Sequence, residues 1–241
     1  PGPDPYDAHG HGTHVAGIIG AVGNNGTGVS GVAWTAKIMA LKFMSSGGMG
    51  WESDAASAIE YGVMMGADVL NNSYSGTDWS TPLYEAIQLA GASGVLVVAA
   101  AGNDYSDNVV FPNYPANYDC ANIISVAATD AGDWLAWFSN FGATTVDVGA
   151  PGDGIYSTWL YGDYTWLSGT SMACPVVSGI AALLKAQEPT LTLSQWRDRV
   201  IWTGDPLPTL EGKCITGLRV NLLNALQGYY SVQITSQSPM P

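Results

Sequence analysis

Three segments, far apart in the chain, each place a chemically useful side chain among small residues. They read HGHGTHVAG at 9–17, VVAAAGN at 97–103 and SGTSMACP at 168–175. The first offers the imidazole of His11, a group whose pKa suits it to take a proton and return it. The last offers the hydroxyl of Ser171, which becomes a nucleophile when a base removes its proton. Together they indicate acyl-transfer chemistry.

The third group is the side-chain amide of Asn103, at the end of an apolar run. Such an amide can donate a hydrogen bond to a developing oxyanion. Ser171 is expected to begin a long helix, whose N-terminus also favours negative charge. Each residue has a structural alternative, because serine is a common helix N-cap and asparagine is common in turns. The hydrolase pattern GxSxG does not fit, since Ala173 occupies the last glycine position.

The neighbouring histidines leave a second kind of chemistry open. His9, His11 and His14 are close in sequence and could be proposed as the ligands of a zinc hydrolase. No HExxH pattern is present, and no adjacent carboxylate has metal-ligand spacing. We expect His14 to be a hydrogen-bonded core side chain.

Strand-like and helix-like segments alternate along the chain, which predicts a parallel sheet flanked by helices. The run at 95–101 is apolar throughout, as in a strand buried on both faces. A capping box of Thr192 and Gln195 predicts the start of a further helix. Strands are expected at 36–43, 67–73, 95–101, 122–128 and 145–149, and helices at 53–65, 81–92 and 171–187.

The composition of the chain argues against some classes of binding partner. Of the 241 residues, 47% are hydrophobic and 11% charged, and the net charge is −13 with seven Lys and Arg. So few cations argue against nucleic acid and against an anionic membrane surface. No run of apolar residues is long enough to span a bilayer. The three cysteines Cys120, Cys174 and Cys214 cannot all pair with one another, and the sequence does not choose one disulfide.

The three segments, in this order, resemble the subtilisin-like (subtilase) family of serine proteases. HGTHVAG and GTSMA are highly specific to it, and weaker similarity extends from about residue 6 to 226. The resemblance implies an α/β fold of three layers, with a mostly parallel central sheet flanked by helices. It also implies a secreted or extracytoplasmic monomeric endopeptidase that acts on polypeptides, needs no cofactor for catalysis and is often made with a propeptide.

The resemblance also implies roles for single residues. His11 is the general base, Ser171 the nucleophile, and Asn103 a donor in the oxyanion hole. A substrate backbone is expected along Ser73, Tyr74 and Ser75 as an added strand. The remaining expected site residues line the first specificity pocket (Ala100, Ala101, Gly102 and Asn113) or supply oxygen ligands to a structural calcium ion (Asn25, Thr27 and Val29).

One family feature is not found. The triad aspartate of the family lies well before the histidine, in an Asp-Ser/Thr-Gly motif, and neither Asp4 nor Asp7 matches it. We therefore expect a peptidase domain at 1–226 without its N-terminal part and a tail at 227–241. We expect the absent part to carry the acid and one strand, so that this chain alone is impaired. The alternative is a catalytically inactive module of the same fold that binds peptides.

Overall fold

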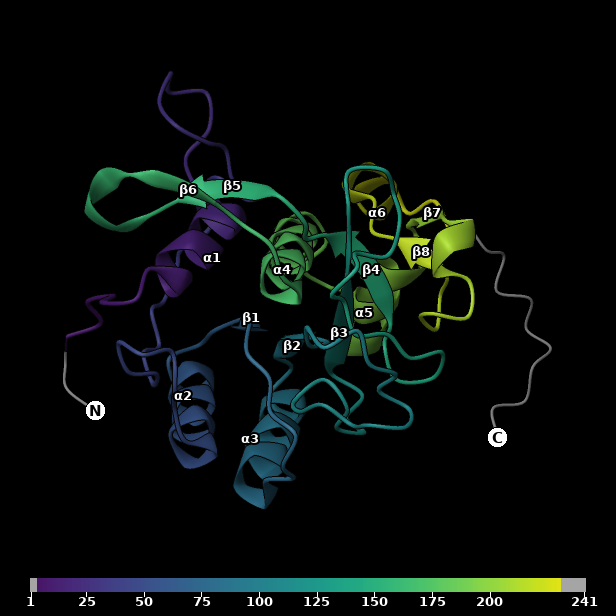
Figure 1. The fold of residues 1–241 in the computed structure, drawn as a ribbon, viewed down its shortest axis with the longest axis horizontal. Coiled ribbons are helices and arrows are strands. Elements are labelled where there is room, and N and C mark those ends of the chain that lie inside the picture. Colours follow the sequence, from purple (N-terminus) through teal and green to yellow (C-terminus); the bar gives the residue numbers. More distant parts are fainter. Residues whose placement is uncertain (1–3, 231–241) are drawn as a thin grey trace.

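A central sheet of six strands runs in the order β1-β2-β3-β4-β8-β7 (Figure 1). The computed structural model describes residues 4–230. Neighbouring strands from β1 to β8 are parallel, and β7 pairs antiparallel with β8. The strands are β1 (Val69–Asn72), β2 (Leu96–Ala100), β3 (Ile123–Thr129), β4 (Val148–Pro151), β7 (Asp205–Pro206) and β8 (Leu218–Arg219).

Helices cover both faces of the sheet, as Figure 1 shows. On one face lie α2 (Glu52–Met64) and α3 (Thr81–Ala92). On the other lie α4 (Thr170–Gln187), α5 (Leu193–Trp202) and α6 (Leu222–Gln227). None of the helices within residues 4–230 is both long and apolar enough to cross a membrane.

Strand β2 joins the two hydrophobic cores. Its side chains alternate, so Leu96, Val98 and Ala100 pack toward α4 while Val97 and Ala99 pack toward α2 and α3. All five are buried. The three-layer fold with a mostly parallel sheet is therefore confirmed.

The helix that carries His11, α1 (His11–Gly20), packs beside α4 and under a two-stranded hairpin. The hydroxyls of Thr158 and Ser157 donate to the carbonyls of Thr13 and His14, each at 2.8 Å. These bonds fix α1 against the hairpin. The hairpin consists of β5 (Ile155–Thr158) and β6 (Tyr164–Leu167), and two 3₁₀ turns lie at η1 (Leu160–Gly162) and η2 (Pro208–Leu210).

Most of the expected elements are present. The helix at 81–92 has its predicted bounds, and the Thr192–Gln195 capping box forms at the start of α5. The strand expected at 145–149 is displaced to β4. Residues 231–241, most of the expected tail, lie outside the described part of the chain.

The strand expected at 36–43 is wrong. The segment contains no strand in the structure, because no neighbouring strand pairs with it. Within residues 4–230, β1 is the edge strand and pairs only with β2, so its other side is unpaired there. Ile38 and Met39 consequently remain 46% and 41% exposed, although their sequence reads as a buried strand.

Asp7 organises the start of α1, a role that the sequence did not suggest. Its carboxylate accepts hydrogen bonds from the backbone N–H groups of Gly10 and Thr13, both at 2.8 Å, and from the Thr13 hydroxyl at 2.7 Å. Partial burial opposes ionisation, but the bonds from Gly10, Thr13 and His9 outweigh it and lower the pKa of Asp7 to about 2.

We predict that Asp7→Ala lowers the free energy of unfolding by about 1 kcal/mol, as for loss of a helix cap. Because the folded pKa lies below that of the unfolded chain, the charged part of this stabilisation is present above the unfolded value and lost as pH falls through about 2. Denaturant unfolding at several pH values measures it. Asp4→Ala is the control, since Asp4 accepts a hydrogen bond from Tyr6 N in an exposed turn. An equal effect of both variants would contradict the assignment.

Candidate active site

A groove of about 1050 Å³ separates α1 from the open edge of β1. It lies beyond the carboxyl ends of β1 and β2, where parallel α/β sheets place their binding sites. The imidazole, the amide and the hydroxyl singled out by sequence all line it: His11, Asn103 and Ser171. The structure therefore brings three segments distant in sequence to one cleft.

Ser171 is the second residue of α4, and the backbone beside it holds its hydroxyl. The Oγ atom donates to the carbonyl oxygen of Ser73 at 3.1 Å, and the Ser73 hydroxyl donates back to the Ser171 carbonyl at 2.9 Å. Ser73 follows directly after β1. The reciprocal pair thus ties the start of α4 to the segment that the sequence predicted as the wall for a bound peptide.

Asn103 is oriented by the residue before the serine. Its Oδ1 accepts from the Thr170 backbone N–H at 2.8 Å and from the Thr170 hydroxyl at 2.9 Å, which leaves its Nδ2 group as the donor. A Cβ built on Gly169 would lie 3.6 Å both from that Nδ2 and from the backbone nitrogen of Ser171. The two nitrogens are therefore equally distant from one point beside Gly169.

The loop after β2 requires glycine and a buried amide. Gly102 has φ +113°, and an added Cβ would lie 2.3 Å from Nδ2 of Asn140. Asn140 is fully buried and accepts from Asp104 N at 2.8 Å while donating to the Ala101 carbonyl at 3.2 Å. Sequence analysis missed both Asn140 and Thr170 as positioning residues. Only Thr170 carried a signal, because it lies inside the SGTSMACP segment.

His11 begins α1 on the opposite wall of the groove. Burial lowers the pKa of its imidazole below the ordinary value, the charges of His9 and His14 lower it further, and Asp7 opposes them. The ring is thus held in the neutral form, which can accept a proton. Within residues 4–230, His11 makes no hydrogen bond to Ser171 or to a carboxylate.

The other histidines differ in position. His14 is fully buried, with Nε2 3.2 Å from the Thr165 carbonyl, and so occupies the core as expected. The ring centres of His9 and His11 are 6.3 Å apart, edge to face. No group of three His, Cys, Asp or Glu within the described chain is arranged to hold a metal ion. The histidine triplet therefore does not form the ligand set of a zinc hydrolase.

The expected substrate residues fall into two groups. Ala100 and the segment of Ser73, Tyr74 and Ser75 line the groove. Ala101 and Gly102 are buried behind it. Asn113 is 5% exposed, with Nδ2 3.0 Å from the position of a Gly102 Cβ and Oδ1 without a hydrogen-bond partner.

The loop expected to bind calcium does not provide a complete site. Oδ1 of Asn25 accepts from the backbone N–H of Thr27 at 3.0 Å, as in an ordinary turn. With the carbonyls of Thr27 and Val29, the loop offers three oxygens, whereas calcium takes about six to eight. Cys120, Cys174 and Cys214 are all free thiols.

We predict that His9→Gln raises the pKa of His11, because the variant removes a cation that repels the protonated imidazole. An NMR titration of the His11 ring measures the shift directly and needs no enzymatic activity. Asp4→Asn should leave the titration unchanged, since Asp4 does not contribute to the His11 shift. An unchanged or lowered His11 pKa in His9→Gln would show that the two rings do not interact.

A hydroxyl at a helix start, an imidazole lining the same groove and two nitrogen donors beside Gly169 indicate the class of protein: an α/β fold with the groups of a serine hydrolase. The model of the subtilase family matches residues 1–229. The chain belongs to the subtilase family of serine proteases.

Named relatives agree with this placement. The chain is 46% identical to subtilisin DY of Bacillus licheniformis over 204 residues, covering 83% of this chain and 72% of the relative. It is also 46% identical to thermitase of Thermoactinomyces vulgaris, covering 76% of this chain and 63% of the relative. A protease structure from Pseudoalteromonas arctica superimposes with a TM-score of 0.81 at 33% identity, covering 90% of this chain and 70% of the other.

Proposed function

We propose that this chain hydrolyses peptide bonds as an endopeptidase, with Ser171 as nucleophile and His11 as general base. The observation that carries the proposal is that Asn103 Nδ2 and the Ser171 backbone nitrogen lie equally close to one point beside Gly169. A carbonyl oxygen bound there would gain two hydrogen bonds as it becomes an oxyanion, next to the hydroxyl that attacks.

The reaction follows from these positions. The Ser171 hydroxyl breaks its hydrogen bond to the Ser73 carbonyl and transfers its proton to the neutral His11 ring. The Ser171 oxygen forms a bond to the substrate carbonyl carbon. His11 then gives the proton to the departing amine, which leaves an acyl ester on Ser171. A water molecule, deprotonated by the same imidazole, hydrolyses the ester and restores the hydroxyl.

The lack of a carboxylate on His11 within residues 4–230 limits the rate in this proposal. In a subtilisin, loss of the acid alone lowered kcat about 3 × 10⁴-fold. The open edge of β1 faces the groove that His11 lines, and its backbone groups can pair with a further strand. A carboxylate on such a strand would orient the imidazole and stabilise its charged form.

The remaining parts of the proposal rest on family membership. We propose action outside the cytoplasm on polypeptides, as a monomer, with a propeptide as a further partner. The tail at 227–241 is proposed to lie outside the peptidase domain. A structural calcium ion at Asn25, Thr27 and Val29 would need additional oxygen ligands from elsewhere. The alternative function, peptide binding without hydrolysis, is separated from this one by the reactivity of Ser171.

We predict that a fluorophosphonate probe labels Ser171, because a hydroxyl beside a base and an oxyanion hole displaces the fluoride from phosphorus. Mass spectrometry of the labelled peptide identifies the residue. Ser171→Ala should abolish labelling, whereas Ser194→Ala should not, although Ser194 also lies in the first turn of a helix. Absence of labelling both in residues 1–241 and in any longer natural form would favour the binding module.

We predict that Asn103→Ala lowers kcat for a peptide substrate about 10²- to 10³-fold with little change in KM, a magnitude measured for an oxyanion amide in a subtilisin. Steady-state kinetics gives both constants. Because Asn103 Oδ1 also holds Thr170, thermal unfolding must show that the variant is folded. Asn224→Ala, on helix α6 and not among the residues that line the groove, is the matched control, and an equal loss of kcat in both variants would remove the proposed role.

A further inference from the structure

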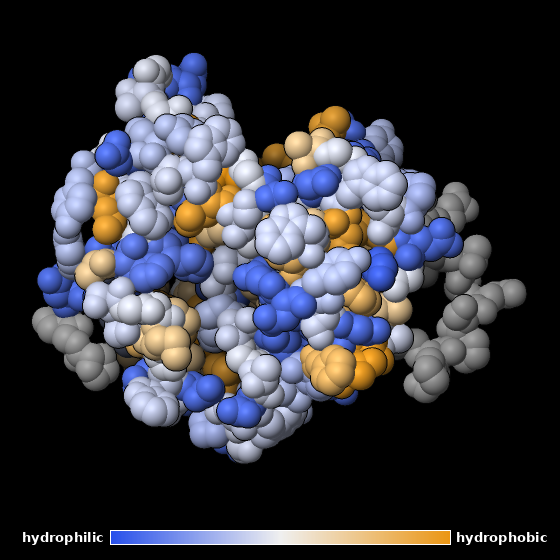
Figure 2. All heavy atoms as spheres, in the orientation of Figure 1, coloured by the Kyte–Doolittle hydropathy of each residue, from blue (hydrophilic) through white to orange (hydrophobic). Residues whose placement is uncertain are grey.

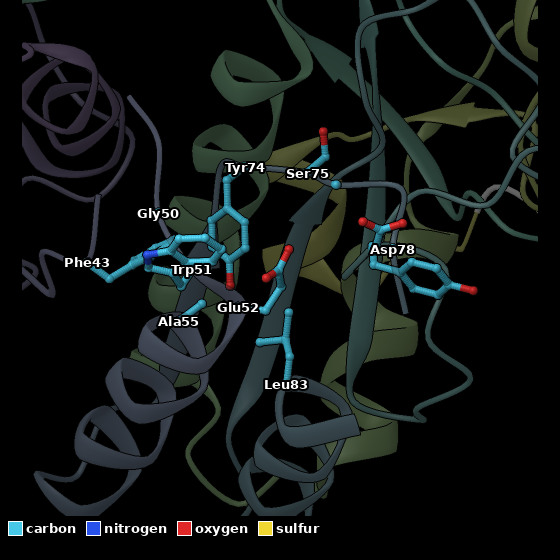
Figure 3. A pocket seen from close by; sticks show the side chains of 11 residues that line it. Phe43, Gly50, Trp51, Glu52, Ala55, Tyr74, Ser75, Asp78 and Leu83 are labelled. Carbon is cyan, nitrogen blue, oxygen red and sulfur yellow. The ribbon is translucent and has the colours of Figure 1, made fainter. Parts of the chain in front are cut away.

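A second pocket lies next to the groove and is lined by carboxylates and aromatic rings (Figure 3). The two carboxylates belong to Glu52, the first residue of α2, and to Asp78. No Lys or Arg is among the residues that line it. Neither carboxylate forms a salt bridge or accepts a hydrogen bond within residues 4–230, so both are available to a ligand.

The walls are aromatic and rigidly packed. Phe43 contacts Tyr74 edge to face, with ring centres 4.9 Å apart. Tyr114 packs against Trp79 at 5.4 Å and is joined to Gly76 by backbone hydrogen bonds of 2.7 and 2.9 Å. Trp51 lies at the mouth and is 74% exposed. Aromatic faces attract cations, and the attraction adds to that of nearby carboxylates.

The Tyr74 hydroxyl is a polar group without a partner. Its oxygen is buried and makes no hydrogen bond to any described residue. Figure 3 shows the Tyr74 ring between Trp51 and Glu52, and the hydroxyl at the end of the ring lies between these two side chains. Burial raises the pKa of Tyr74, so the hydroxyl stays neutral and its oxygen can accept a hydrogen bond from an ammonium or guanidinium group.

The pocket is connected to the nucleophile by three residues of chain. Ser73 accepts the hydrogen bond of Ser171, and the following Tyr74, Ser75 and Gly76 line the pocket. An extended chain covers about 3.3 Å per residue, so the segment that lines the pocket extends from Tyr74, next to Ser73, to Gly76 roughly 10 Å away. A peptide laid along this segment would place a side chain in it roughly two to four residues from the bond that is cut.

We propose that this pocket binds a lysine or arginine side chain of the peptide substrate, with Glu52 and Asp78 as the residues that determine specificity. The inference rests on the proposed function for the position of the substrate, and it adds the class of residue that the substrate carries. Charge is complementary, because the chain has a net charge of −13 and favours cationic peptides at a distance as well.

Binding to the Ser171→Ala variant tests the proposal without requiring chemistry. The probes are N-acetylated alanine-rich hexapeptide amides that carry a single lysine, or its uncharged near-isostere norleucine, at each position in turn. At one position the lysine peptide should bind about tenfold more tightly than the norleucine peptide, as expected for one cation–π contact and one screened ion pair. High salt should reduce this preference.

The matched variants are Glu52→Gln and Glu60→Gln, both on α2, of which only the first lines the pocket. Adding Glu52→Gln should remove most of the lysine preference, and Glu60→Gln should keep it. Equal binding of lysine and norleucine peptides at every position, or a preference that survives Glu52→Gln together with Asp78→Asn, would overturn the proposal. Thermal unfolding confirms that each variant is folded.

The outcome is separable from that of the proposed chemistry. If Ser171 reacts with a fluorophosphonate but lysine and norleucine peptides bind alike, the pocket assignment alone fails. If the lysine preference is found but Ser171 is unreactive, the pocket assignment holds and the chain is a peptide-binding module.

Discussion

The site depends on the paired hydrogen bonds between Thr170 and the side-chain oxygen of Asn103. They connect the first turn of α4, which carries the serine, to the end of β2, which precedes the amide. Because the oxygen of the amide is occupied, the N–H₂ group is the part of Asn103 left to donate to a ligand in the groove that Asn103 lines. The same Thr170 hydroxyl accepts from Gly102 N at 3.1 Å, so one threonine fixes both the amide and the loop that bears it.

The second constraint is the free edge of β1. A parallel sheet is normally covered on both faces, whereas an edge strand has one side with unpaired backbone groups. Here that side of β1 opens on a groove of about 1050 Å³. The hydrophobic residues of 36–43 line part of that groove without pairing. Figure 2 shows that apolar side chains are also exposed between polar ones on the face of the molecule that it draws. The groove therefore exposes the reacting groups, and within residues 4–230 no carboxylate accepts a hydrogen bond from the His11 ring.

The sequence predicted the site better than it predicted the edge of the sheet. His11, Asn103 and Ser171 lay in segments with distinctive spacing, and parallel strands bring their carboxyl ends together, so a common cleft could be expected. Asn140 could not be anticipated, because its contacts to Asp104 and Ala101 join segments distant in the chain. Asp7 is different, because its partners Gly10 and Thr13 lie within six residues of it and the missed signal was local. The prediction of a strand at 36–43 was wrong, because the spacing of apolar residues shows which face of a segment is apolar. It does not show whether a neighbouring strand is present to pair with the segment.

The most direct test is a crystal structure of the chain after reaction with a peptidyl boronic acid, which forms a tetrahedral adduct on a serine hydroxyl. We predict a bond from boron to Ser171 Oγ, with one boron oxygen about 2.7–3.1 Å from both Asn103 Nδ2 and the Ser171 backbone nitrogen, and the other facing the His11 ring. An adduct whose oxygens point away from Asn103, or a His11 ring beyond hydrogen-bonding reach of the adduct, would contradict it.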